Sequence, residues 1–301
     1  SFTLELSSQR QKALLTFICS SIENIPDSLL LMIEFGLIEA VRSINQDQFI
    51  QQMQFIYSSL FISSSDLSFL ENLLYYLKFP KCQLKIDTFD SIIKCISHDN
   101  ILPISYEALF LDQRILNELS NPDPLVVSHI LDLYSICCTA GEHCVGVLFT
   151  NTEMINHIFS YLSTQDESLL LSCLKFFDAL VSNSETASNL SNIYQLFINF
   201  NMANLIQCDE LNYQCRFIIS QSYLKLCNHL TEVQLEPILN PLILQKTIDV
   251  FDTDDDKRSI FICHFRTLFV KFQSNEQIIS MLKTLILEND SFENLIDFPI
   301  E

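Results

Sequence analysis

Residues 153–183, EMINHIFSYLSTQDESLLLSCLKFFDALVSN, carry the pattern that decides the fold. An apolar stretch is followed by a polar turn over residues 163–167 and then by a longer apolar stretch. In the longer stretch, apolar residues recur every three or four positions, which is the spacing of one face of an α-helix. The sequence therefore predicts two helices joined by a short turn. The apolar positions of the second helix are Leu170, Cys173, Phe176, Phe177 and Leu180.

The same order of helix, turn and helix returns along the chain. Clear copies begin at Phe35, Ile115 and Thr247, and two weaker copies fill the gaps. In the long helix of each copy we choose one apolar anchor residue and a second one seven residues, or two helical turns, later. The six anchor pairs are Met53 and Leu60, Phe89 and Ile96, Ile130 and Cys137, Cys173 and Leu180, Ile219 and Leu226, and Ile262 and Phe269.

The copies follow one another at a period of about 42 residues, within the range of armadillo and HEAT repeats. From about Leu29 to Phe272 the chain resembles this superfamily. The resemblance implies an all-α, right-handed solenoid of about six stacked units, each burying its apolar face against its neighbours. Armadillo units usually carry a glycine at the unit start or before the long helix, but only Gly36 does so here. We therefore expect a divergent armadillo- or HEAT-like chain that forms a single domain over residues 1–301.

This fold predicts which anchor residues lie in the core. Nine of them are expected to be buried. They are Met53, Leu60, Phe89, Ile96, Ile130, Cys173, Leu180, Ile219 and Phe269.

The composition limits the classes of function. Hydrophobic residues make up 49% of the 301 residues and the mean hydropathy is +0.25, which is typical of a folded chain. The net charge of −20 repels phosphate backbones, so we expect no nucleic-acid ligand. Glycine occurs only at positions 36, 141 and 146, too sparsely for a phosphate-binding loop or a nucleophile elbow. We expect no enzyme activity, although a helical enzyme with an unrecognised site stays an alternative.

The cysteines and the apolar runs indicate the environment of the chain. Eleven Cys residues are scattered without a disulfide framework, so we expect reduced thiols in a helical core. The densest apolar run, Leu29 to Ile33, is interrupted by Glu34 and is too short to span a membrane. We find no targeting segment in the first residues. A cytoplasmic protein is expected, with a nuclear location possible.

Two clusters resemble metal sites only in part. The run from Asp252 to Asp256 begins like a calcium loop, but Lys257 stands where that loop needs Gly and Cys263 where it needs Glu. A His/Cys cluster between His129 and Cys144 lacks a CxxC pair, and Cys137 in it already lies on a helix-packing stripe. We therefore expect no metal and no cofactor.

The long helices also define candidate partner-binding positions. Armadillo proteins that bind extended peptides use the long helix of each unit, and the resemblance places the exposed groove positions two and six residues after each anchor. None of these positions holds Asn, and the chain has no Trp, so it lacks the pairs that nuclear-import adaptors of this superfamily use. The positions are Phe55 and Ser59, Ser91 and Cys95, Asp132 and Ile136, Lys175 and Ala179, Gln221 and Lys225, and His264 and Leu268.

From these observations we expect a non-catalytic scaffold or adaptor that binds a protein or peptide partner. We place the partner around Asp132, Lys175, Gln221 and Lys225, where the two lysines could pair with an acidic segment. The alternative is a karyopherin-like transport adaptor whose negative charge attracts basic cargo. Neither the partner's identity nor the oligomeric state follows from the sequence.

Overall fold

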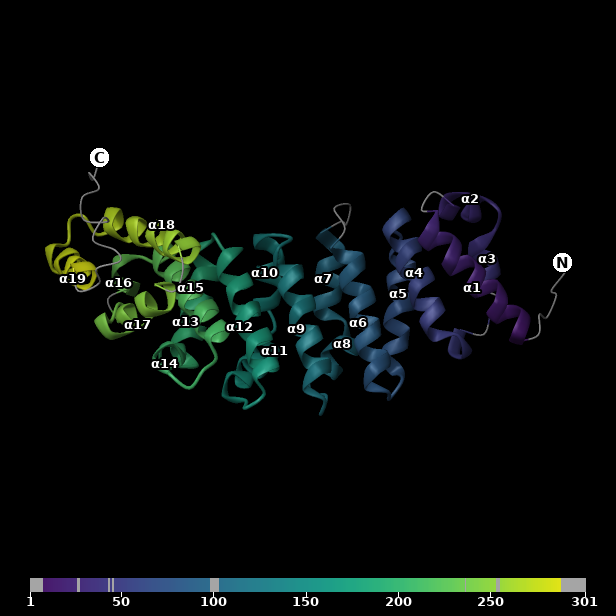
Figure 1. Ribbon diagram of the computed structural model, residues 1–301, viewed down its shortest axis with the longest axis horizontal. Coiled ribbons are helices and arrows are strands. Elements are labelled where there is room, and N and C mark those ends of the chain that lie inside the picture. Colours follow the sequence, from purple (N-terminus) through teal and green to yellow (C-terminus); the bar gives the residue numbers. More distant parts are fainter. Residues whose placement is uncertain are drawn as a thin grey trace. The chain divides into compact units, whose positions relative to one another are not determined.

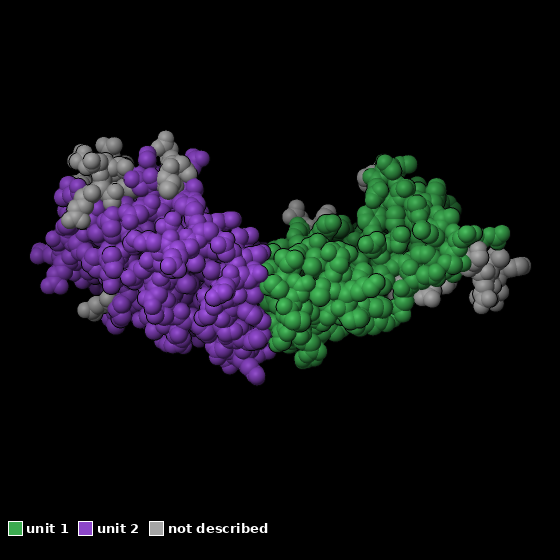
Figure 2. Space-filling view, turned by 60° about the horizontal axis from the view of Figure 1, so that its bottom comes forward, with its two compact units in different colours: residues 1–137 green, residues 138–301 purple. Residues whose placement is uncertain are grey.

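The computed structural model describes residues 8–25, 28–42, 44, 46–97, 103–235, 237–252 and 255–287. Every regular element within these ranges is a helix, so the all-α prediction is confirmed (Figure 1). The chain divides into two compact units, residues 1–137 (unit 1) and 138–301 (unit 2), coloured separately in Figure 2. The single domain over residues 1–301 stays a prediction.

Unit 1 contains three helices of 15 residues that carry the first three anchor pairs: α4 (Ile50–Ser64), α6 (Cys82–Ile96) and α9 (Pro124–Cys138). Helix α4 packs against α6, and both contact α5. Helices α1 and α2 also contact α4. The other elements are α1 (Ser8–Asn24), α2 (Ser28–Glu34), α3 (Leu37–Arg42), η1 (Gln46–Gln48), α5 (Leu67–Leu74), η2 (Tyr75–Lys78), α7 (Pro103–Leu111) and α8 (Gln113–Glu118), where η denotes a 3₁₀ helix.

Unit 2 contains the other three long helices: α12 (Glu167–Ser182), α15 (Tyr213–His229) and α18 (Asp255–Lys271). Helix α15 contacts both α12 and α18, and the shorter helices α14 and α17 contact α15 as well. The other elements are α10 (Glu142–Phe149), α11 (Thr152–Ser160), η3 (Tyr161–Ser163), α13 (Ala187–Asn199), α14 (Met202–Gln207), α16 (Glu232–Leu235), α17 (Pro241–Phe251) and α19 (Glu276–Leu287).

Polar residues in the connections set where the helices begin. In the turn predicted over residues 163–167, the Asp166 carboxylate accepts a 2.8 Å hydrogen bond from the Leu169 amide and caps α12. A side-chain cap of this kind satisfies an amide that has no partner within the helix. Pro124 and Pro241 begin α9 and α17, where a missing amide costs little. Further side-chain N-caps are Asp66, Asp112, Asn151, Thr186, Asn212 and Asn240.

Large aromatic side chains hold the short and long helices of unit 2 together. Phe159, Phe177, Phe197 and Tyr223 are buried and form a continuous chain, with ring-centroid separations of 5.9, 6.5 and 5.8 Å. Such pairs add a specific geometric preference to the burial of their apolar surface. The core of unit 2 therefore runs from α11 through α12 and α13 to α15.

The anchor residues test the expected core. Eight of the nine are buried, whereas Phe269 on α18 is only half-buried. The buried stripe of α18 consists of Phe261, Phe265, Leu268 and Phe272, so the chosen anchors of this copy lie one residue away from the true core positions. Residues on both stripes are apolar, and periodicity alone cannot choose between them.

Candidate functional site

A groove lies between α4 and α6 of unit 1. It has a volume of about 420 Å³, and the predicted groove positions Phe55, Ser59 and Ser91 line it. The fourth predicted position on these helices, Cys95, is buried instead, and its Sγ lies 3.7 Å from the Ser58 carbonyl of α4. The full lining is Gln51, Gln54, Phe55, Ser58, Ser59, Ile62, Asp87, Asp90, Ser91 and Lys94.

A buried glutamine fixes the two walls of the groove relative to each other. The Nε2 atom of Gln54 on α4 donates to Thr88 Oγ1 on α6 at 2.7 Å and to the Leu84 carbonyl at 3.4 Å. Thr88 Oγ1 in turn donates to the same carbonyl at 2.7 Å. Because buried polar groups are costly unless hydrogen-bonded, this network favours one spacing of α4 and α6.

Short side chains keep the groove open. The hydroxyls of Ser58 and Ser59 both donate to the Phe55 carbonyl at 2.8 Å, and Ser91 donates to the Asp87 carbonyl at 2.8 Å. These hydroxyls therefore turn back onto their own helices, and their oxygen lone pairs remain able to accept from a ligand. The half-buried Phe55 and Ile62 supply apolar surface between them.

The α6 wall of the groove is acidic. Asp87 and Asp90 are half-buried, and Asp90 Oδ1 lies 3.4 Å from Nε2 of His129 on α9. Asp132 lies one turn after His129 on the same face of α9, is half-buried, and has no hydrogen bond or ion pair within the described ranges. The exposed Lys94 is the only cation among the groove-lining residues. The arrangement can hold a segment that offers apolar surface and a positive charge.

Unit 2 places the other three predicted residues on two neighbouring helices. Lys175 lies exposed on α12, while Gln221 and Lys225 lie half-buried on α15. Lys225 Nζ is 2.8 Å from both carboxylate oxygens of Asp178 and 2.9 Å from Ser182 Oγ. Lys225 is thus paired within unit 2, which differs from the free lysine that we expected to meet an acidic partner.

The next long helix is joined to α15 by polar contacts. His264 Nδ1 on α18 lies 3.0 Å from Asn228 Nδ2, and Lys271 Nζ donates to the carbonyls of Cys227, Asn228 and Leu230 at the end of α15. Burial lowers the pKa of His264, and the nearby Lys225 lowers it further, while Asp178 opposes them. Leu268, a predicted groove position, is buried, in keeping with the one-residue shift of α18.

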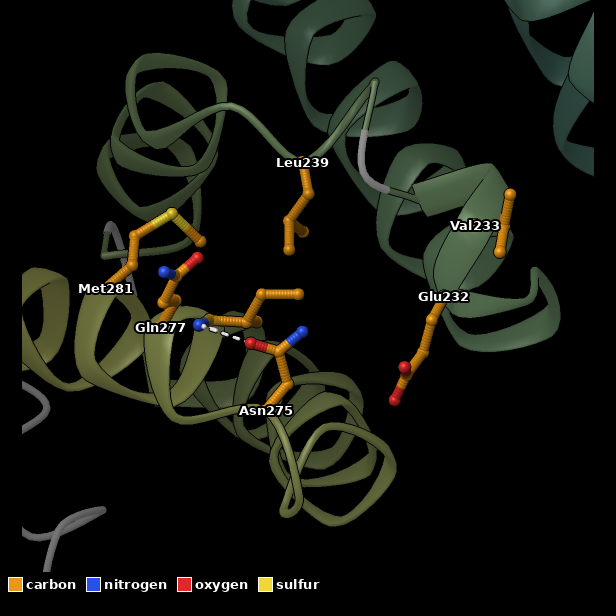
Figure 3. Close-up of a pocket in the computed structure, with 7 residues that line it drawn as sticks. Glu232, Val233, Leu239, Asn275, Gln277 and Met281 are labelled. Atoms are coloured by element: carbon orange, nitrogen blue, oxygen red, sulfur yellow. Dashed lines mark hydrogen bonds between the residues drawn. The ribbon is translucent and has the colours of Figure 1, made fainter.

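A second hollow, this one in unit 2, lies between α16 and α19 (Figure 3). Its volume is about 340 Å³. Sequence reasoning did not identify it, because α16 is a helix of four residues without an apolar period. It is lined by Glu232, Val233, Leu239, Asn275, Gln277, Ile278 and Met281.

Most of the cysteines have the properties of core residues. Seven of the eleven are buried, all eleven lie in described parts of the chain, and none forms a disulfide. Burial raises the pKa of both Cys95 and Cys227 to about 12, so these thiols are protonated at neutral pH. The pKa of Cys19 is raised to about 11, by burial and by Glu23.

The metal candidates can be placed only in part. Thr253 and Asp254 of the acidic run lie outside the described residues, and Asp252 accepts a 2.7 Å hydrogen bond from Arg258 Nε. Among the residues that the structure describes, no three His, Cys, Asp or Glu side chains come together as a metal-ion site. Across the same ranges, no helix has the length and apolar character needed to cross a membrane.

Comparisons with known proteins bear on the fold. No family model and no curated protein matches the chain. The crystal structure of an engineered protein from a structural genomics consortium matches with a TM-score of 0.52 and 11% identity, over 72% of this chain and 86% of that one. A second engineered protein matches with a TM-score of 0.48 and 8% identity, over 81% and 92%. The first likeness shows that this helical fold also occurs in an engineered protein.

Proposed function

We propose that the chain is a non-catalytic protein-interaction scaffold, built as a right-handed armadillo- or HEAT-like solenoid of about six units. Two observations support this architecture. Each of the six anchor pairs falls within one helix of 15 to 17 residues, and neighbouring long helices in unit 2 pack directly against each other. Stacked units of this kind usually provide an extended surface for recognition.

The α4–α6 groove carries the functional proposal. It combines apolar surface at Phe55 with hydroxyl and amide groups and with the carboxylates of Asp87 and Asp90. Such a mixture of apolar surface and a few polar groups is typical of sites that bind another molecule. We place the partner segment here and at the neighbouring Asp132, and not at Lys225, because that lysine is already paired with Asp178.

The acidic wall also favours a second candidate function, a karyopherin-like adaptor that binds basic cargo. Asp87, Asp90 and Asp132 would attract Lys or Arg side chains, and the net charge of −20 would speed the approach of a basic partner. The two functions differ in how steeply binding depends on salt, because the scaffold also uses the apolar surface of the groove. Binding to a transport adaptor of this kind should fall steeply between low and physiological ionic strength.

A pull-down from native cell extract with matched variants tests the groove. We expect Ser91→Arg to prevent capture of the main partner, because it places a long cation in the groove. Glu34→Gln, which neutralises an exposed carboxylate at the end of α2, should capture as much partner as the unchanged protein. Equal capture by the unchanged protein and Ser91→Arg, with unchanged helical circular dichroism, would exclude the α4–α6 groove as the binding site.

A further inference from the structure

The hollow between α16 and α19, which we call the α16–α19 pocket, has an apolar interior open to solvent. Leu239 points into the space between the side chains from α16 and those from α19 (Figure 3). Ile278 and Met281 on α19 are half-buried and line the same space. Val233 on α16 lies at the edge of the pocket and is 81% exposed. The pocket therefore leaves apolar surface uncovered.

Two amide side chains stand at the edge of this apolar surface. Asn275 Oδ1 accepts a hydrogen bond from the Ile278 amide at 3.3 Å, seen as the dashed line in Figure 3. The Asn275 amide nitrogen and both polar atoms of Gln277 have no hydrogen-bond partner among the described residues. A primary amide carries the same donor and acceptor groups as a peptide unit, so these two side chains can hydrogen-bond an extended backbone.

A carboxylate completes the pocket on the α16 side. Glu232 is exposed and forms no ion pair with the residues described here. Lys271 interacts with Glu232 electrostatically but forms no ion pair with it, and the Lys271 ammonium is hydrogen-bonded to carbonyls at the end of α15. In a chain with a net charge of −20, a ligand group beside Glu232 is favoured if it is positively charged.

We propose that the α16–α19 pocket binds an extended protein segment in which an apolar residue is next to Lys or Arg. The apolar side chain contacts Leu239, Ile278 and Met281, the amides of Asn275 and Gln277 bond the segment's backbone, and Glu232 pairs with the basic side chain. The volume of about 340 Å³ suits one or two side chains of a segment and not a folded domain. This site is separate from the α4–α6 groove, and either can bind without the other.

Methyl NMR with small peptide probes tests this proposal on the full chain. The probes are N-acetyl-leucyl-lysine methylamide and N-acetyl-leucyl-glutamate methylamide. We expect the lysine probe to shift the methyl signals of Met281 and Ile278 with a Kd in the range of about 1 to 10 mM, as suits so few contacts. The glutamate probe should bind at least about twofold more weakly. Absence of a shift at about 20 mM lysine probe would overturn the proposal.

Three variants locate the binding. Gln277→Lys should weaken the binding of the lysine probe at least about twofold, because it removes an amide that bonds the segment's backbone and adds a cation to the pocket. Gln277 is exposed, so the change should leave folding unaffected. Gln195→Lys is the matched control, since it makes the same change at an exposed residue of α13 outside the pocket. Glu232→Gln should preserve binding but remove the preference for the lysine probe. Unchanged binding of the lysine probe in Gln277→Lys, weakened binding in Gln195→Lys, or a retained charge preference in Glu232→Gln would each contradict the assignment.

Discussion

Two pairs of neighbouring long helices, α4 with α6 in unit 1 and α12 with α15 in unit 2, differ in the side chains between them. In unit 1, serines at positions 58, 59 and 91 leave a groove between α4 and α6. In unit 2, Lys225 on α15 instead forms an ion pair with Asp178 on the neighbouring helix α12. Both pairs consist of neighbouring long helices in contact, so their side chains decide whether the pair carries an open groove or an ion pair between the helices.

The comparison also separates two kinds of charge. The Asp178–Lys225 pair is largely shielded from water, with side-chain exposures of 25% and 20%. Asp90 in the groove wall is 49% exposed, and its neighbour His129 is 3.4 Å away. A shielded pair contributes to stability and resists exchange with a partner, whereas an exposed carboxylate contributes little to folding and can meet a ligand. This contrast leads to four predictions.

The largest effect should appear in the cores, where the units are alike. Leu60 in α4 and Leu180 in α12 are both fully buried second anchors. We expect Leu60→Ala and Leu180→Ala each to lower the free energy of unfolding of its unit by about 2 to 5 kcal/mol, from lost apolar burial and the cavity left behind. Urea unfolding followed by circular dichroism measures the loss. A cost below about 1 kcal/mol for either variant would contradict the equivalence of the two anchors.

Neutralising one carboxylate in each unit should cost more stability at the Asp178–Lys225 ion pair of unit 2 than at the groove of unit 1. We expect Asp178→Asn to destabilise unit 2 by about 1 to 2 kcal/mol, because it leaves Lys225 partly buried beside a neutral amide. Asp90→Asn should change the stability of unit 1 by less than about 0.5 kcal/mol. Urea unfolding provides both values, and equal costs would show that the difference in shielding has no energetic consequence.

Much of this comparison could be predicted from the sequence, and part of it could not. The armadillo resemblance places Phe55, Ser59 and Ser91 at a groove, and all three line the α4–α6 groove, whereas the fourth position, Cys95, is buried. Asp87 also lines the groove two residues before the Phe89 anchor, and extending the pattern by one turn would have found it. The α18 copy was misplaced by one residue because both of its stripes are apolar.

The Asp178–Lys225 pair was missed for a different reason. It joins residues 47 positions apart, and the periodicity of a single helix contains no information about its neighbour. Other contacts span similar separations: Arg114 with Glu71 is 43 residues apart, and Asn189 with Glu142 is 47. Polar contacts between neighbouring copies thus occur at about one repeat period. Comparing residues one period apart is the sequence test that could have revealed them.

Acid should weaken the α15–α18 contact of unit 2. Burial lowers the pKa of His264 and of His229, with Lys225 and Lys271 respectively adding to the effect, so the folded state binds fewer protons than the unfolded state below about pH 6.5. The stability from these groups is complete above that pH and is lost as the pH falls through the lowered folded-state values. Helix α17 also contacts α15 and α18, but its charged residues are paired elsewhere: Lys246 with Asp209, and Asp249 with Gln245.

Thermal unfolding between pH 7.5 and 5.5 measures this effect. We expect the Tm of the unchanged protein to fall over this range, and His264→Gln to reduce the fall because it removes one of the two groups. An equal fall in His264→Gln would assign the pH dependence to other groups.

The smallest effect concerns how strongly each unit binds a basic peptide, and charge reversal at one lysine in each unit tests it. Lys94 borders the acidic groove of unit 1, and Lys175 lies on α12 of unit 2; both are exposed. Reversing either charge should leave the free energy of unfolding within about 0.5 kcal/mol. Lys94→Glu should strengthen the binding of a fluorescent hexalysine peptide about two- to fivefold, because it adds a carboxylate beside Asp87 and Asp90, whereas Lys175→Glu should not. Fluorescence anisotropy at low ionic strength compares the variants under equal net charge. A similar gain in both would mean that hexalysine responds to the total charge of the chain and not to the groove.

The double change at Lys175 and Lys225 is less informative, because a glutamate at position 225 would face Asp178 and weaken unit 2 itself.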